Sequence, residues 1–134
     1  MLERDVVRSK AEDGIARLEL HRPDCLNAMN RQLLRQLLAA LEWAAANDAV
    51  RAVLITGHGR VFSAGADIRY LNRAPAAEVR ELARLAVAVT GRIEALGKPV
   101  LAALNGDALG AAWRSPRPAR CGWRPRTPVS AIRK

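Results

Sequence analysis

The sequence predicts an α/β protein. Two short apolar runs, residues 52–56 and 100–104, have the length and composition of strands that are covered on both faces. Two longer segments, residues 31–46 and 76–96, carry apolar side chains at helical spacing. Because strands and amphipathic helices alternate along the chain, we expect a sheet with helices packed against it.

The chain is expected to open with a β-hairpin. Residues 15–20 alternate between apolar and polar side chains, so one face of this strand is apolar. A short apolar stretch at residues 6–8 precedes it, and residues 12–14 (Glu-Asp-Gly) are typical of a turn. Pro23 ends the second strand because proline cannot donate a hydrogen bond to a neighbouring strand.

Each predicted helix has recognisable ends. Asn30 is a suitable N-cap for the first helix, and Pro75 fits the first turn of the second. Gly97 and Pro99 end the second helix. The buried stripe of the first helix is predicted to consist of Leu33, Leu34, Leu37, Leu38 and Leu41. That of the second is predicted to consist of Val79, Leu82, Leu85, Val89, Ile93 and Leu96.

Two turns built from small residues could carry chemistry. They cover residues 62–67 and 105–111, and each follows a buried strand and leads towards a helix. Small side chains let a ligand approach the backbone closely, and a helix N-terminus offers unpaired N–H groups. Two N–H groups that converge on one point would form an oxyanion hole. The alternative is that these small residues serve packing alone.

Composition excludes several classes of protein. The chain has 134 residues, of which 50% are hydrophobic and 4% aromatic, which suits one globular domain. Its longest uninterrupted apolar runs have five residues, so no membrane association is expected. The two cysteines, Cys25 and Cys121, fit a reducing compartment and therefore a cytoplasmic location. His21 and His58 are isolated in the sequence, so no metal site is expected.

The positive charge lies mostly in the last part of the chain. The formal net charge is +9, yet residues 111–134 carry seven basic side chains and no acidic one. They also hold four of the seven prolines and two of the three tryptophans. Residues 1–110 are therefore close to neutral, and we expect no specific nucleic-acid partner, although a polycation binds nucleic acid nonspecifically.

Three motifs in order carry a resemblance to a known family. They are R-P-D-C-L-N-A-M at residues 22–29, the segment from V-L-I-T-G at 53–57 to F-S-A-G-A-D-I at 62–68, and K-P-V-L-A-A-L-N-G-D-A-L-G at 98–110. Together they resemble the enoyl-CoA hydratase/isomerase, or crotonase, superfamily, from about Val6 to Gly110.

The resemblance implies a crotonase-like spiral of ββα units, of which this chain carries the N-terminal part. It implies an acyl-CoA thioester as substrate, with no separate cofactor because CoA belongs to the substrate, and a homo-trimer or hexamer as the assembly. In this family two backbone N–H groups stabilise an enolate-like intermediate, and here they would belong to Ala66 and Ala111. The substrate would contact Cys25, Leu26, Ala64, Gly65, Ala66, Asp67, Ile68 and Gly110.

The resemblance breaks down where the family places its acid–base residues. Hydratases carry a glutamate three residues beyond the second oxyanion donor, and here that position is Arg114. Their second glutamate lies in a region with no counterpart in this sequence. Asp67 is expected to cap a turn instead of acting as a base. The alternative to a hydratase or isomerase is therefore an inactive, truncated product, or a module that binds CoA thioesters without turnover.

A reading-frame shift would explain the departure. Permitted codons for residues 111–116, read one base out of phase, can encode Gly-Val-Glu-Ile-Ala, which restores the family's glutamate. When this reading phase is continued to Lys134, it can encode the expected residue types at most further positions of the family's sequence pattern. We therefore expect residues 1–110 to form the N-terminal part of a crotonase-fold domain. Residues 111–134 are expected to be an out-of-frame, disordered tail.

Overall fold

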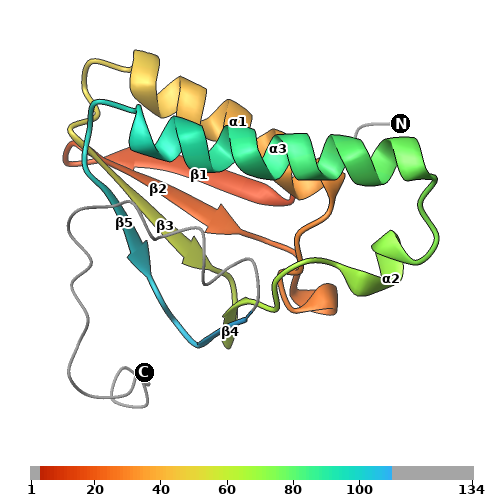
Figure 1. Ribbon diagram of the computed structural model, residues 1–134. Helices are drawn as coiled ribbons and strands as arrows, with labels where there is room; N and C mark the ends of the chain where they lie inside the picture. The colour runs from red at the N-terminus through yellow and green to blue at the C-terminus, as the bar shows by residue number, and fades with distance from the viewer. Residues whose placement is uncertain (1–3, 110–134) are drawn as a thin grey trace.

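The computed structural model describes residues 4–109 of the chain, and Figure 1 shows their arrangement. The strands are β1 (Val7–Glu12), β2 (Ile15–Leu20), β3 (Ala52–Gly57), β4 (Val61–Ser63), β5 (Val100–Ala103) and β6 (Asp107–Ala108). The helices are the 3-10 turn η1 (Pro23–Cys25), then α1 (Arg31–Ala46), α2 (Ile68–Leu71) and α3 (Ala76–Glu94). The expectations for Gly110 and for residues 111–134 fall outside the described residues.

The main sheet has four strands in the order β1-β2-β3-β5. β1 and β2 form the predicted antiparallel hairpin, and its turn places Asp13 and Gly14 in the left-handed region, at φ 52° and 81°. β3 pairs in parallel with both β2 and β5. The predicted α/β class and all four predicted main-sheet strands are confirmed.

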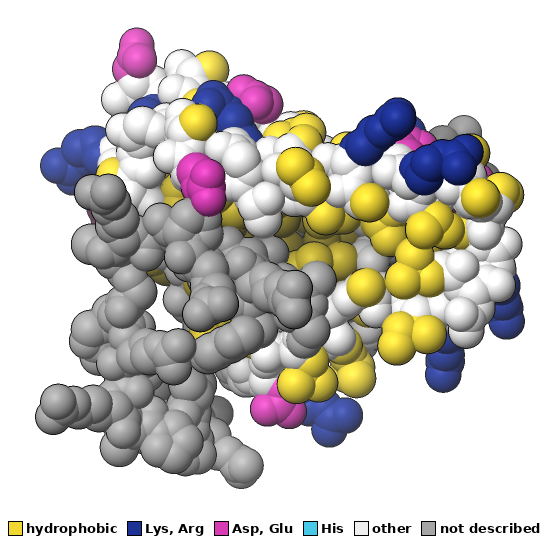
Figure 2. Space-filling model, viewed as in Figure 1, with side chains coloured by type: hydrophobic (Ala, Val, Ile, Leu, Met, Phe, Trp, Pro, Cys, Tyr) yellow, Lys and Arg dark blue, Asp and Glu magenta, His cyan; other side chains and the backbone are white. Residues whose placement is uncertain are grey.

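Helices α1 and α3 lie side by side across one face of this sheet (Figure 1). The apolar face of β2, formed by Ala16, Leu18 and Leu20, is buried beneath them. Leu33 and Leu41 of α1 are fully buried in the same core. Burying one such leucine is worth about 1.5–3 kcal/mol, so this apolar layer holds the sheet and the helices together. Figure 2 shows hydrophobic side chains gathered between the helices and the strands on this side of the molecule.

The helix ends follow the predicted capping residues. The Asn30 side chain accepts a hydrogen bond from the Leu33 N–H at 2.9 Å, and α1 begins at Arg31 as expected. Gly97 has φ 76° just after α3, which ends at Glu94, two residues earlier than predicted.

One predicted core residue of α3 was wrong. Val79 is 36% exposed, whereas the buried core side chains are at most 9% exposed. The first turns of α3 meet α1 through ion pairs: Arg31 lies 2.8 Å from Glu81 and 4.0 Å from Glu78. These charged groups occupy the contact with α1, so Val79 remains partly open to solvent.

A second, two-stranded sheet leads towards the candidate site. β4 and β6 run parallel, with Val61 opposite Asp107 and Ser63 opposite Ala108. The Leu109 N–H also donates to the Ser63 carbonyl at 3.0 Å. In chain order, β1-β2-α1 forms one ββα unit and β3-β4 followed by α2 and α3 forms another, as the spiral of ββα units requires. No helix within residues 4–109 is long and apolar enough to cross a membrane.

Candidate functional site

The turn between β4 and α2 directs the backbone N–H of Ala66 away from Met29. A parallel bridge pairs Met29 with Ala66. It uses the neighbours of Ala66: the Met29 N–H donates to the Gly65 carbonyl at 2.7 Å, and the Asp67 N–H donates to the Met29 carbonyl at 3.0 Å. Because backbone groups alternate in direction along an extended chain, the Ala66 N–H points away from Met29. Gly65 has φ 89°, a conformation that favours glycine at this turn.

Ser63 fastens this turn to the segment before α1. Its hydroxyl, which is fully buried, donates to the Asn27 carbonyl at 2.8 Å and accepts from the Gly65 N–H at 3.2 Å. The Ala64 N–H donates to the Leu26 carbonyl at 3.0 Å. Residues 26–29 and 63–67 therefore form one hydrogen-bonded unit, although they are far apart in the sequence.

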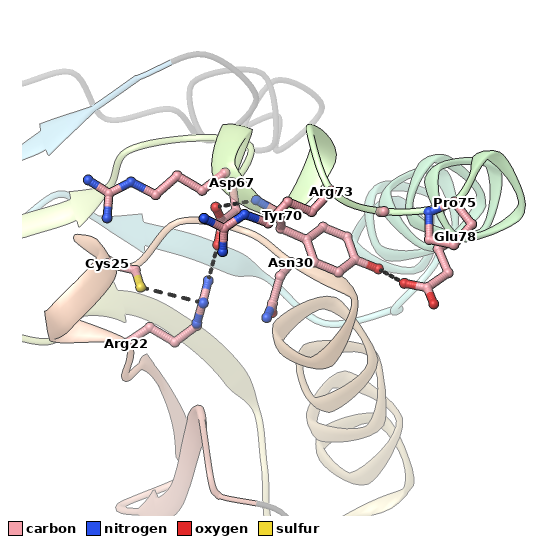
Figure 3. A pocket seen from close by; sticks show the side chains of 10 residues that line it. Arg22, Cys25, Asn30, Asp67, Tyr70, Arg73, Pro75 and Glu78 are labelled. Atoms are coloured by element: carbon pink, nitrogen blue, oxygen red, sulfur yellow. Dashed lines mark hydrogen bonds and ion pairs between the residues drawn. The ribbon is translucent and has the colours of Figure 1, made fainter.

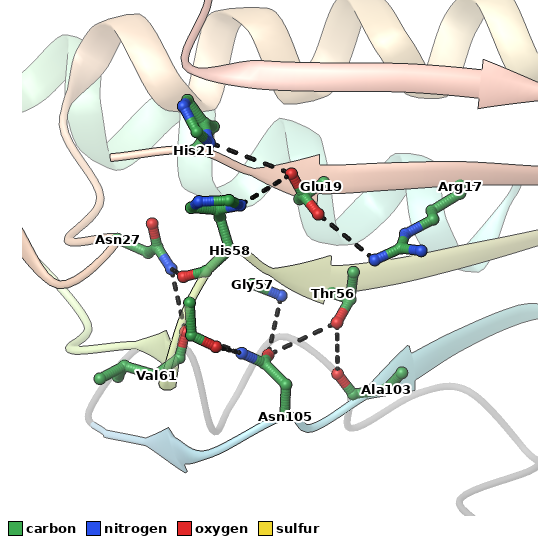
Figure 4. A network of polar contacts seen from close by, with 11 residues as sticks. Arg17, Glu19, His21, Asn27, Thr56, Gly57, His58, Val61, Ala103 and Asn105 are labelled. Carbon is green, nitrogen blue, oxygen red and sulfur yellow. Dashed lines mark hydrogen bonds and ion pairs between the residues drawn. The ribbon is translucent and has the colours of Figure 1, made fainter. Parts of the chain in front are cut away.

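Asn27 holds a third segment against this unit (Figure 4). Its side chain is fully buried, and its backbone adopts a left-handed conformation with φ 54°. Its oxygen accepts from the Arg22 N–H, and its amide nitrogen donates to the carbonyls of His58 and Val61, all at 2.9 Å. Asn27 belongs to the motif at residues 22–29, but the motif alone did not predict this role.

Asp67 begins α2, as predicted, and also forms an ion pair. Its carboxylate accepts from the Tyr70 N–H at 3.0 Å and lies 3.1 Å from the Arg22 guanidinium. Partial burial of Asp67 acts to raise its pKa, but the Tyr70 N–H and Arg22 outweigh burial and lower this pKa below 3.8. Both charged side chains are largely shielded from water, so the pair fixes the wall between η1 and α2.

A cavity of about 460 Å³ opens beside this ion pair (Figure 3). Its lining residues are Arg22, Cys25, Asn30, Asp67, Arg69, Tyr70, Arg73, Ala74, Pro75 and Glu78. The Tyr70 hydroxyl donates to Glu78 at 2.8 Å, and burial together with Glu78 raises the Tyr70 pKa.

The cavity has unbalanced positive charge. Among the described residues, Arg69 and Arg73 form no ion pair, whereas Asp67 already pairs with Arg22 and Glu78 with Arg31. Guanidinium groups recognise phosphate and carboxylate groups in two-point contacts. The cavity can therefore accept an anionic group.

The structure brings several of the predicted substrate-contacting residues together. Cys25 and Asp67 line the cavity, and Cys25 is exposed with a free thiol. The exposed side chains of Leu26 and Ile68 lie next to them in the chain, at 43% and 69% exposure. Ala64, Gly65 and Ala66 form the turn described above. Gly110 and Ala111 fall outside the described residues.

The two histidines are not isolated, contrary to the sequence prediction. Their ring centroids are 4.3 Å apart in an edge-to-face arrangement, and Glu19 lies beside both (Figure 4). His21 directly follows β2 and His58 directly follows β3, and the parallel register places Leu20 opposite Gly57. Burial of His21, with Arg8 nearby, lowers the His21 pKa. The two histidines follow the ends of strands that pair in parallel, and this pairing brings them together.

This fold, with its turn and cavity, defines a protein of the crotonase type. The family model described as enoyl-CoA hydratase/isomerase matches residues 10–113. The chain therefore belongs to the enoyl-CoA hydratase/isomerase family, and the predicted family and fold are confirmed.

Relatives and solved structures agree with this assignment. The chain is 41% identical over 100 residues to crotonyl-CoA hydratase of Syntrophomonas wolfei. This match covers 74% of this chain and 38% of the relative. It is 40% identical over 102 residues to 4-chlorobenzoyl coenzyme A dehalogenase-2 of an Arthrobacter species. This match covers 73% of this chain and 37% of the relative. An enoyl-CoA hydratase structure from Bacillus anthracis superimposes with a TM-score of 0.78 at 27% identity, covering 83% of this chain and 44% of that one. The chain thus spans well under half the length of these relatives.

Proposed function

We propose that the chain binds an acyl-CoA thioester, and that the Ala66 N–H is one of two backbone donors to the thioester oxygen. The observation that carries this proposal is the direction of the Ala66 N–H. The parallel bridge to Met29 uses the groups on either side of Ala66 and leaves this N–H directed away from Met29. A fixed donor of this kind stabilises an enolate-like oxyanion without reorganisation.

The second donor in this proposal is Ala111, which lies outside the described residues. It is assigned from the resemblance of the segment at residues 98–110 to the family's motif.

The arginine-rich cavity is proposed to receive the phosphate groups of coenzyme A. Arg69 and Arg73 have no acidic partner within residues 4–109, while Cys25 and Asp67 connect the cavity to the proposed oxyanion donor. The relatives reported above are named for CoA thioesters of different acyl groups, so the shared chemistry lies in the CoA portion and in the thioester.

Turnover is a separate question from binding. The family's first glutamate position is Arg114 in this sequence, and arginine cannot act as a general base because it does not lose its proton. Binding without hydration is therefore the second candidate function, and it rests on this one residue. The family-type homo-trimer or hexamer and a cytoplasmic location belong to the proposal as well.

A calorimetric titration tests the proposal. The wild-type chain is titrated with acetoacetyl-CoA and with CoA, and we expect the thioester to bind more tightly because only it offers the oxygen. Ala66→Pro removes the N–H and spares the bridge, so it should reduce the preference for the thioester at least tenfold. Ala66→Ser keeps the N–H and serves as the control. Equal affinity of Ala66→Pro and wild type for the thioester would refute the proposal.

A second assay separates the two candidate functions. Crotonyl-CoA is incubated with the chain, and loss of the enoyl-thioester absorbance is followed. Hydration supports an active hydratase, whereas binding of the thioester without loss of absorbance supports a binding module. If the thioester binds in neither assay, both candidate functions are contradicted.

A further inference from the structure

The cluster of Glu19, His21 and His58 plays no part in the proposed function (Figure 4). Each residue offers one potential ligand atom, and these atoms all lie within 4.8 Å of one another. Glu19 Oε1 is 3.2 Å from His58 Nδ1 and 3.9 Å from His21 Nδ1. Ligand atoms that surround Zn²⁺ tetrahedrally at about 2.0–2.1 Å are about 3.3 Å apart. The distance from Glu19 to His58 already matches this spacing, whereas the remaining distances are longer, so a bound ion would draw the three side chains together.

His21 supplies an independent sign that a ligand is missing from this cluster. The residue is only 9% exposed, and its Nδ1 atom is buried without a hydrogen-bond partner among the described residues. The same nitrogen faces Glu19. An unsatisfied buried polar atom destabilises the fold, and a cation between His21 and Glu19 would interact with both groups.

Two arginines beside Glu19 influence how its carboxylate can bind a cation. Arg17 donates to Glu19 Oε2 at 3.3 Å, which leaves Oε1 directed at the two histidines. Arg8 lies opposite Glu19 across the β1–β2 hairpin. Supporting hydrogen bonds of this kind commonly orient a metal-binding carboxylate, while the two positive charges lower the affinity for a cation. The His58 side chain is 41% exposed, so solvent and ions reach the cluster from its side.

We propose that Glu19, His21 and His58 bind one Zn²⁺ ion at the ends of β2 and β3. Two imidazole nitrogens and one carboxylate form a donor set that Zn²⁺ accepts, with water in the fourth position. The parallel register of β2 and β3 brings the two histidines together. The site is separate from the cavity between η1 and α2, since the two share no lining residue.

The composition of the chain makes the test unusually direct. The sequence contains only two histidines, so any imidazole ligation in the untagged 134-residue protein comes from this cluster. The protein is titrated with ZnCl₂ by calorimetry, and the two imidazole rings are followed by nitrogen–proton correlation NMR. We expect one equivalent of Zn²⁺ to bind and both imidazole signals to shift.

Three variants assign the ligands. His58→Gln and Glu19→Gln should each weaken Zn²⁺ binding at least tenfold. The double variant Cys25→Ser/Cys121→Ser removes both thiols and should bind Zn²⁺ as wild type does. His58 is partly exposed and lies in a loop, so His58→Gln is expected to keep the fold, which circular dichroism of the metal-free variant checks. Zn²⁺ that binds wild type and His58→Gln equally, or that leaves both imidazole signals unmoved, would overturn the proposal.

Discussion

Replacing Asn27 should destabilise the protein more than any other single change to a polar side chain described above. Asn27→Ala removes three hydrogen bonds of a fully buried side chain, to Arg22, His58 and Val61. Each such bond contributes about 1 kcal/mol, and partners left unsatisfied in the interior cost more. The left-handed backbone at φ 54° adds about 1 kcal/mol for alanine. We expect the free energy of unfolding to fall by about 3–5 kcal/mol.

Guanidinium chloride unfolding, followed by circular dichroism, measures this change. Asn27→Gly separates the two contributions, because glycine tolerates the left-handed backbone and should recover about 1 kcal/mol of the loss. Asn72→Ala is the matched control: Asn72 is exposed, and its replacement should change stability by less than about 0.5 kcal/mol. A loss of less than about 1 kcal/mol for Asn27→Ala would show that its hydrogen bonds do not hold the three segments together.

Three further predictions concern other parts of the chain. A Cβ atom at Gly57 would lie 2.5 Å from the Phe62 carbonyl oxygen, whereas one at Gly91 in α3 would meet nothing within 4 Å. Gly57→Ala should therefore lower the melting temperature, and Gly91→Ala should raise it through a gain of about 0.5–1 kcal/mol; the opposite order in a thermal melt would contradict the packing described at β3. The pKa of Asp67 is lower in the folded chain than its ordinary value of 3.8, so the folded state gains stability above pH 3.8 and loses it as the pH falls through the lower, folded pKa. The stability difference between wild type and Asp67→Asn should accordingly shrink on acidification in urea unfolding series, and a difference that stays constant with pH would exclude the ionised carboxylate as its source. Finally, the DNA that encodes residues 111–134 should contain a second reading phase with a family-type glutamate codon, and its absence would rule out a frame shift.

Local sequence signals predicted most of the fold. The alternation at residues 15–20, the Asn30 cap and the leucines of α1 each depend on neighbours within a few residues, and the structure confirms them. Val79 departs from the prediction because helical spacing alone does not show which partner a helix face meets. Ion pairs with α1 occupy this end of α3.

The candidate site was only partly predictable. The turn around Ala66 and the capping role of Asp67 came from motifs and small residues close together in the sequence. The role of Asn27 depends on carbonyl groups at His58 and Val61, more than 30 residues away. The meeting of His21 and His58 likewise depends on the register of two parallel strands, which the sequence pattern of each strand does not specify.

The hydrogen bonds of Asn27 and Ser63 have a consequence for the affinity of any molecule that enters the cavity. Arg22 and Cys25 line the cavity. The segment that carries them is tied to β4 through Ser63 and to the His58 loop through Asn27 before a ligand binds. A surface that is ordered in advance loses little freedom on association. Little of the binding free energy of a ligand would then be spent on ordering this segment. Loss of the Asn27 hydrogen bonds would shorten the residence time of the ligand, although Asn27 itself does not line the cavity.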